Sequence, residues 1–137
     1  MLPVAASRSS LSKVEALAKT GQQSKAMAEA EHLLELSQRS TEALRFAADL
    51  NLEHGSPRAA LELYWELLHS PQLKLDPDER AELVYRVGVS AQQAGDLDTA
   101  EKQLTEALRL NPDEHRALRA LAGVQAAREQ WQEQLDT

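Results

Sequence analysis

Two pairs of side chains have the spacing at which a helix could bind a metal ion. Glu29 is followed three residues later by His32, and Glu66 is followed in the same way by His69. Residues three apart share one face of a helix, so each pair could offer a carboxylate and an imidazole to one metal, as di-metal bundles do. Such a bundle also needs two further glutamates and four long antiparallel helices. A metal-binding helical bundle therefore stays only an alternative.

No other set of residues points to catalysis. The chain has no cysteine, which excludes disulfides, thiolate zinc sites and a cysteine nucleophile. No serine, histidine and acid combination, phosphate-binding loop or pair of catalytic carboxylates stands out. His54 and His115 fall at expected helix ends, where pairing with the helix dipole explains them. We therefore expect a protein that is not an enzyme and needs no metal or cofactor.

The composition fits one small helical domain without affinity for nucleic acid. The 137 residues are 42% apolar and 4% aromatic, and good helix formers dominate. The 15 basic and 22 acidic residues give a formal net charge of −7. A charge of this sign repels phosphate backbones and anionic lipids. We expect a protein or peptide partner.

The sequence also bears on location and completeness. No apolar run approaches the ~20 residues of a membrane span, and residues 1–14 lack the apolar centre of a signal peptide. We expect no membrane insertion and a cytoplasmic location. Residues 134–137 hold no glycine or basic residue to stop a helix. This ending favours a piece of a longer protein, and the alanine-, arginine- and glutamate-rich style favours a bacterial one.

Glycine and alanine recur together along the chain. A glycine is followed five residues later by an alanine three times, at Gly21 and Ala26, Gly55 and Ala60, and Gly95 and Ala100. The first two glycines are 34 residues apart and the last two are 40 apart. A period in this range is typical of stacked helical repeats. The longer interval is explained by an irregular stretch at residues 69–76, which we expect to pack down rather than bind a partner.

Three dipeptides mark expected helix starts. They are Ser56-Pro57, Asp76-Pro77 and Asn111-Pro112. The first side chain can accept a hydrogen bond from an unpaired amide of the first turn, and proline has no N–H to leave unpaired there. Glu79 and Glu114 lie three residues after the second and third caps, as a capping box requires.

The segment from Ala81 to Glu114 resembles the tetratricopeptide repeat, a helix-turn-helix unit of 34 residues. Its signature positions hold Val84, Val87, Gly88 and Ala91, then Gly95 at the turn, then Ala100, Leu104, Ala107 and Pro112. Gly88 and Ala100 are expected to be small because the two helices cross closely there. Gly95 is expected to end the first helix with a positive φ.

The resemblance extends with departures to the rest of the chain. The preceding repeat departs at Asn51, and the first repeat has Ser10 and Lys13 where apolar residues are expected. The leading helix of the first repeat is therefore slipped, frayed or modified as a cap. After His115 the chain resembles another leading helix, which either caps the stack or begins a fourth repeat with Trp131 at its aromatic position.

We therefore predict one all-α domain over residues 1–137. The resemblance implies a right-handed α-solenoid of antiparallel helix pairs, with a concave face lined by the leading helix of each repeat. The expected repeats are 7–39, 41–77 with the insertion 69–76, 81–114, and a partial or capping helix at 115–135.

In this family, exposed positions of the leading helices contact ligands. The matching positions hold Glu42, Arg45, Asp49 and Leu52, then Glu82, Tyr85, Arg86, Val89 and Gln92, then Arg116, Arg119 and Gly123. From these we select as the groove Arg45, Asp49, Leu52, Tyr85, Arg86, Val89, Gln92 and Arg119. The three arginines offer forked donors, so a peptide with an acidic group is the expected ligand. Local ion pairs such as Glu42 with Arg45 are the competing interpretation.

The resemblance implies a scaffold or adaptor that binds proteins within a larger assembly. A small secretion or assembly chaperone is an alternative. A clamp for the carboxyl termini of heat-shock chaperones is disfavoured, because Asp49 and Leu52 stand where that clamp has asparagines. Another alternative is a self-associating scaffold that uses Trp65 on the convex side. We expect Trp65 instead to pack beneath residues 71–75.

Overall fold

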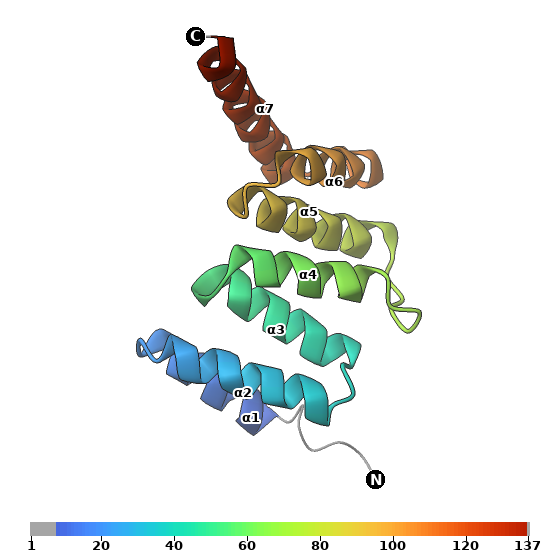
Figure 1. Ribbon diagram of the computed structural model, residues 1–137. Helices are drawn as coiled ribbons and strands as arrows, with labels where there is room; N and C mark the ends of the chain where they lie inside the picture. Colours follow the sequence, from blue (N-terminus) through green and yellow to red (C-terminus); the bar gives the residue numbers. More distant parts are fainter. Residues whose placement is uncertain (1–7, 137) are drawn as a thin grey trace. The chain divides into compact units, whose positions relative to one another are not determined.

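The computed structural model describes the backbone of residues 8–136 and the side chains of residues 12–130. The described residues form seven helices and no strand, which confirms the all-α prediction (Figure 1). The helices are α1 (Arg8–Lys19), α2 (Gln23–Leu36), α3 (Thr41–His54), α4 (Pro57–Leu68), α5 (Pro77–Gln93), α6 (Leu97–Leu110) and α7 (His115–Asp136). They form two compact units that divide between Leu73 and Lys74. The side chain of Trp131 lies outside the described part.

Unit 1 consists of two antiparallel helix pairs, α1 with α2 and α3 with α4 (Figure 1). The pairs turn at Gly21 and Gly55, as predicted. Ala26 and Ala60, five residues after these glycines, are both 0% exposed. Small side chains therefore lie where the helices of unit 1 meet. Larger buried side chains complete this core, among them Val14, Leu34, Leu44, Tyr64 and Leu67.

The first helix of unit 1 departs from the repeat pattern at Lys13. Lys13 is exposed, whereas Val14 is 1% exposed and Ala18 is 3% exposed. Val14 lies 34 residues before the buried Ala48, so its burial agrees with the repeat pattern. The three interpretations of this helix, slipped, frayed or modified as a cap, stay predictions. Ser10 lies outside the described side chains.

The turn between α2 and α3 has an unusual backbone and a charged anchor. Gln38 and Arg39 have φ values of 55° and 56°, a region that residues other than glycine rarely adopt. The Arg39 guanidinium donates two hydrogen bonds of 2.7 Å to the Glu66 carboxylate on α4. Ser40 then caps α3 by accepting a hydrogen bond from the Ala43 amide.

Unit 2 contains the antiparallel pair α5 and α6, with α7 packed mainly against α6. The predicted capping box at the start of α5 is present, because Asp76 and Glu79 each accept a hydrogen bond from the other's amide. Gly95 ends the α5 turn with a φ of +86°. A Cβ at Gly88 would lie 2.7 Å from the Leu104 Cγ, so α5 and α6 do cross closely there.

The predicted helix start at Asn111-Pro112 is wrong. Helix α7 begins at His115, three residues later. The Asn111 side chain accepts a hydrogen bond from the amide of Asp113, and the Glu114 amide donates to the Asn111 carbonyl. These bonds close a turn, which is a conformation that asparagine favours. The Glu114 carbonyl then accepts the first α7 hydrogen bonds, and its carboxylate does not complete a capping box with Asn111.

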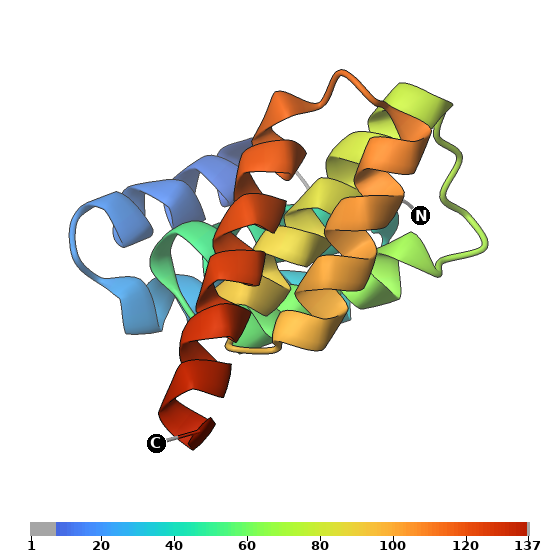
Figure 2. The same ribbon diagram turned by 90° about the horizontal axis from the view of Figure 1, so that it is seen from above.

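Helix α7 is the longest element, with 22 residues. Its last turns extend past the ends of α5 and α6 in both views (Figures 1 and 2). Ala117 and Val124 are 0% exposed, and the Arg128 guanidinium lies 2.6 Å from an Asp98 oxygen and 3.1 Å from a Glu101 oxygen on α6. Among the described residues, none of the helices combines the length and apolar character that a membrane span requires.

Candidate functional site

An open hollow of ≈ 200 Å³ lies on unit 1 between α1 and α3. It is several times larger than the ~30 Å³ that one water molecule occupies. Phe46 and Leu50 supply apolar lining, and three carboxylates outnumber the two groups that can carry positive charge. The full lining is Glu15, Lys19, Phe46, Asp49, Leu50, Glu53 and His54. The hollow can therefore accommodate an apolar stem that ends in a positive charge.

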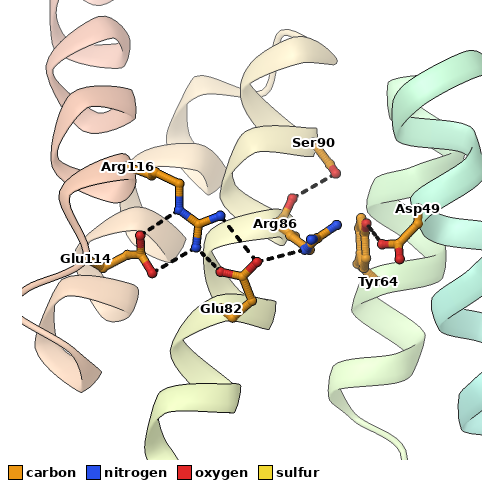
Figure 3. Close-up of polar contacts among 7 residues, drawn as sticks. All are labelled: Asp49, Tyr64, Glu82, Arg86, Ser90, Glu114 and Arg116. Atoms are coloured by element: carbon orange, nitrogen blue, oxygen red, sulfur yellow. Dashed lines mark hydrogen bonds and ion pairs between the residues drawn. The ribbon is translucent and has the colours of Figure 1, made fainter.

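Two contacts orient polar groups at this hollow. The hydroxyl of the buried Tyr64, on α4, donates a hydrogen bond to the Asp49 carboxylate (Figure 3). The His54 Nε2 lies 3.7 Å from a Glu53 oxygen, so the two attract each other when His54 is protonated. Glu15 and Glu53 are both exposed to solvent. These two carboxylates of the hollow are thus accessible from outside.

The leading helices of unit 2 present a different surface. The Arg116 guanidinium, from α7, bonds to Glu82 on α5 and to Glu114 before α7, where its Nε lies 2.8 Å from a Glu114 oxygen (Figure 3). Its Cζ also lies 4.6 Å from the centroid of the Tyr85 ring, within cation–π range. These contacts connect α5 and α7.

Hydrogen bonding in this cluster shifts the ionisation of its members. The hydrogen bond from Arg116 lowers the pKa of the Glu114 carboxyl below its ordinary value, and partial burial opposes the shift. Hydrogen bonds to Glu114 and Glu82 raise the pKa of Arg116. Arg86 Nε lies 3.2 Å from a Glu82 oxygen, and the Ser90 hydroxyl donates to the Arg86 carbonyl. The polar groups on this face therefore satisfy one another.

Comparison with known structures decides the fold. The MamA D159K mutant matches 90% of this chain and 69% of its own length, with 20% sequence identity and a TM-score of 0.69. YrrB, a TPR protein with an unusual peptide-binding site, matches 93% of this chain with 17% identity and a TM-score of 0.63. The chain spans only 62% of YrrB.

The chain has a tetratricopeptide-repeat (TPR) fold. No protein-family model matches the sequence, and no curated protein matches it either. The TPR assignment confirms the predicted helical-repeat solenoid. In the TPR frame, α1, α3, α5 and α7 are leading helices, and α2, α4 and α6 are second helices.

The predicted groove residues of the TPR frame fall into different environments. Asp49 lines the hollow of unit 1, whereas Arg45 and Leu52 do not. Tyr85 and Arg86 take part in the contacts around Arg116 and Glu82. Val89 and Gln92 are half-buried on α5.

The three arginines that were predicted to line the groove also differ in their ionic contacts. Arg45 and Arg119 are exposed, and neither forms an ion pair with any residue that the structure describes. Glu42 does not pair with Arg45 within that range either. Arg86 is already bonded to Glu82. Arg45 and Arg119 therefore have their guanidinium groups available as donors, and their role in a groove stays a prediction.

Sequence reasoning missed most of the hollow's lining. Phe46 follows Arg45 directly and is the only phenylalanine of the chain, which is a signal that could have found it. Glu15 and Lys19 belong to α1, the leading helix from which no groove position was selected. Glu53 and His54 lie on the last turn of α3, beyond the positions carried over from the family.

The remaining candidate residues have local roles. Glu66 bonds to Arg39, and His69 Nδ1 lies 2.9 Å from the Trp65 carbonyl, so neither side chain is free for a metal. Within the described part of the chain, no group of three or more histidine or acidic side chains could hold one. Trp65 is 43% exposed and its ring contacts His69, which corrects the expectation that residues 71–75 cover it. Self-association through Trp65 stays a prediction.

Proposed function

We propose that this TPR chain is a non-catalytic module that binds a partner peptide or helix along its leading helices. The observation that carries the proposal is the hollow between α1 and α3. It lies on the leading helices, where the TPR frame predicts a ligand face. YrrB, a structural neighbour, has a peptide-binding site, which supports a peptide as the ligand class.

The hollow favours a partner segment that carries a lysine or arginine. Phe46 and Leu50 offer apolar contact to the side-chain stem, while Glu15 and Glu53 offer carboxylates to its charged end. The net charge of −7 adds a long-range attraction for such a segment. An acidic group in the partner, as expected from the sequence, has Arg45 and Arg119 as its available donors.

A random peptide library tests this proposal directly. The purified chain selects from a phage-displayed library, and the enriched peptides are synthesised with a fluorescent label. We expect a lysine or arginine at one fixed position of the enriched peptides. Fluorescence anisotropy should then show that Glu53→Gln weakens binding about fivefold, because one charge pair contributes up to ~1 kcal/mol. Phe46→Ala should weaken binding more, because it removes the apolar wall.

Glu62→Gln is the matched control. Glu62 is an exposed carboxylate on α4 and does not line the hollow, so its loss changes the net charge equally and should leave affinity unchanged. Circular dichroism checks that each variant folds. The proposal fails if the enriched peptides lack basic residues, or if Glu53→Gln and Glu62→Gln reduce affinity equally.

A further inference from the structure

We call the face of α7 that contains Leu118 its outer face. This face differs in solvent exposure from the corresponding face of α5, one repeat earlier. On α5 the residues Val84, Val87 and Ala91 are 3%, 0% and 0% exposed, because α6 covers them. The residue of α7 that corresponds to Val84 is Leu118, which is 56% exposed. The outer face of α7 is therefore exposed, whereas α6 covers the corresponding face of α5.

This outer face is shaped to receive a helix. Leu118, Ala122 and Ala126 recur every four residues along it, and all three are exposed. Small side chains at this spacing let two helices approach closely. The opposite side of α7 is already occupied, because Ala117 and Val124 are fully buried within unit 2. The outer face is therefore the side of α7 that remains for a partner.

The charges beside the outer face select the partner. Arg119 lies in the N-terminal half of α7 and Glu129 in its C-terminal half. Both are exposed, and neither has an ion-pair partner among the residues that the structure describes. A second α7 running antiparallel would set the basic half of each helix against the acidic half of the other. A parallel helix would set like charges together, which is unfavourable.

We propose that two copies of the chain associate through an antiparallel pair of α7 helices. Leu118, Ala122 and Ala126 form the contact, and Arg119 of each copy lies toward Glu129 of the other. The arrangement has twofold symmetry, so one self-complementary surface serves both copies. It uses residues of unit 2 alone and none of the residues that line the hollow, so it is argued independently of the proposed peptide binding.

A charge-exchange experiment tests the antiparallel pair. Light scattering across a concentration series should show a dimer for the wild type. Arg119→Glu alone and Glu129→Arg alone should each raise the dimer dissociation constant at least tenfold, because each variant sets like charges together in both contacts. An equimolar mixture of the two variants should dimerise again, because opposite charges then meet at both contacts. Native mass spectrometry identifies that species as the mixed dimer.

Further variants distinguish the α7 contact from association through another surface of the chain. Leu118→Gln should also weaken the dimer, whereas Lys25→Glu, an exposed charge change on α2, should not. A chain that stays monomeric at every concentration overturns the proposal, as does a mixture that stays monomeric. If a labelled peptide of residues 97–110 binds the wild-type monomer and Leu118→Gln abolishes that binding, a foreign α6-like helix is the occupant and the second copy is excluded.

Discussion

The exposed faces of the leading helices differ between the two units. In unit 1, Glu15 and Glu53 stand exposed beside a hollow. In unit 2, Arg116 draws Glu82 and Glu114 together and covers the Tyr85 ring (Figure 3). The repeat frame thus fixes where a side chain lies, but the neighbouring helix decides whether it is available to a ligand.

The units also differ where their helix pairs cross. Unit 2 has Gly88 against the buried Leu104, whereas unit 1 has Ala48 at the equivalent position, 0% exposed. The α5–α6 pair therefore has no room for even one more methyl group at this point. Unit 2 therefore combines paired polar side chains around Arg116 with a close crossing of α5 and α6 at Gly88.

The largest expected effect comes from Gly88→Ala. The added Cβ would lie 2.7 Å from both Cγ and Cδ2 of Leu104, which is 0% exposed and cannot move aside. Overpacking costs about 1–3 kcal/mol, and the gain in helix propensity offsets up to ~1 kcal/mol. We expect a net loss of ~1–2 kcal/mol, measured as a lower midpoint of urea unfolding.

Gly123→Ala is the control for this prediction. Gly123 is an exposed helical glycine of α7, where a Cβ would meet only the end of the flexible Gln92 side chain, at 3.2 Å. It should leave stability unchanged or raise it by up to ~1 kcal/mol. Equal effects of the two substitutions would show that unit 2 is not tightly crossed at Gly88.

Arg116→Gln tests whether the ion pairs of Arg116 stabilise unit 2. The substitution removes the group that both Glu82 and Glu114 bind, and we expect a loss of ~1 kcal/mol at neutral pH. The folded-state pKa of Glu114 lies below its unfolded value of about 4.3. Its stabilisation is therefore complete above that pH and disappears as pH falls through the lowered folded-state pKa.

Urea unfolding at several pH values checks this sign. The stability difference between wild type and Arg116→Gln should narrow below pH ~4 and vanish in stronger acid. Arg58→Gln is the matched control, because Arg58 is an exposed arginine on α4 that forms no ion pair with any residue that the structure describes. A difference that stays constant with pH would mean that Arg116 acts through packing alone.

Glu66→Gln should have the smallest effect. Its partner Arg39 is the main charged contact of unit 1, and both side chains are partly exposed, at 43% and 37%. Exposed pairs contribute about 0.2–1 kcal/mol. The hydrogen bond from Arg39 lowers the pKa of Glu66, so this contribution is also present above pH ~4.3 and lost in acid. Thermal unfolding at low and high salt measures it, and a loss as large as that of Arg116→Gln would contradict the contrast between the units.

Much of the fold could be predicted because it depends on short-range rules. Gly95 ends a helix through its positive φ, and Asp76 starts one through a capping box, both as predicted. The same reasoning failed at Asn111, because an asparagine followed by proline can close a turn as well as start a helix. Sequence spacing does not distinguish those two uses of one side chain.

The candidate site could be predicted only in outline. The leading helices were identified, but the availability of each side chain depends on neighbours that lie far away in sequence. Arg116 meets Glu82 across 34 residues, and Arg86 shares that same carboxylate. The hollow depends on how α1 packs against α3, and α1 departs from the repeat pattern at the exposed Lys13. Helical periodicity alone does not fix such a register.

The turn at Gln38 and Arg39 has a consequence for the unfolding of unit 1. Two left-handed residues in succession cost of order 1–2 kcal/mol each in backbone energy, and the link from Arg39 to Glu66 helps to hold them. Once the hydrogen bonds between Arg39 and Glu66 break, the backbone of Gln38 and Arg39 lowers its energy by leaving the left-handed conformation. Trypsin cleaves after arginine and lysine. When unit 1 is partly unfolded, the first tryptic cleavage is therefore expected after Arg39.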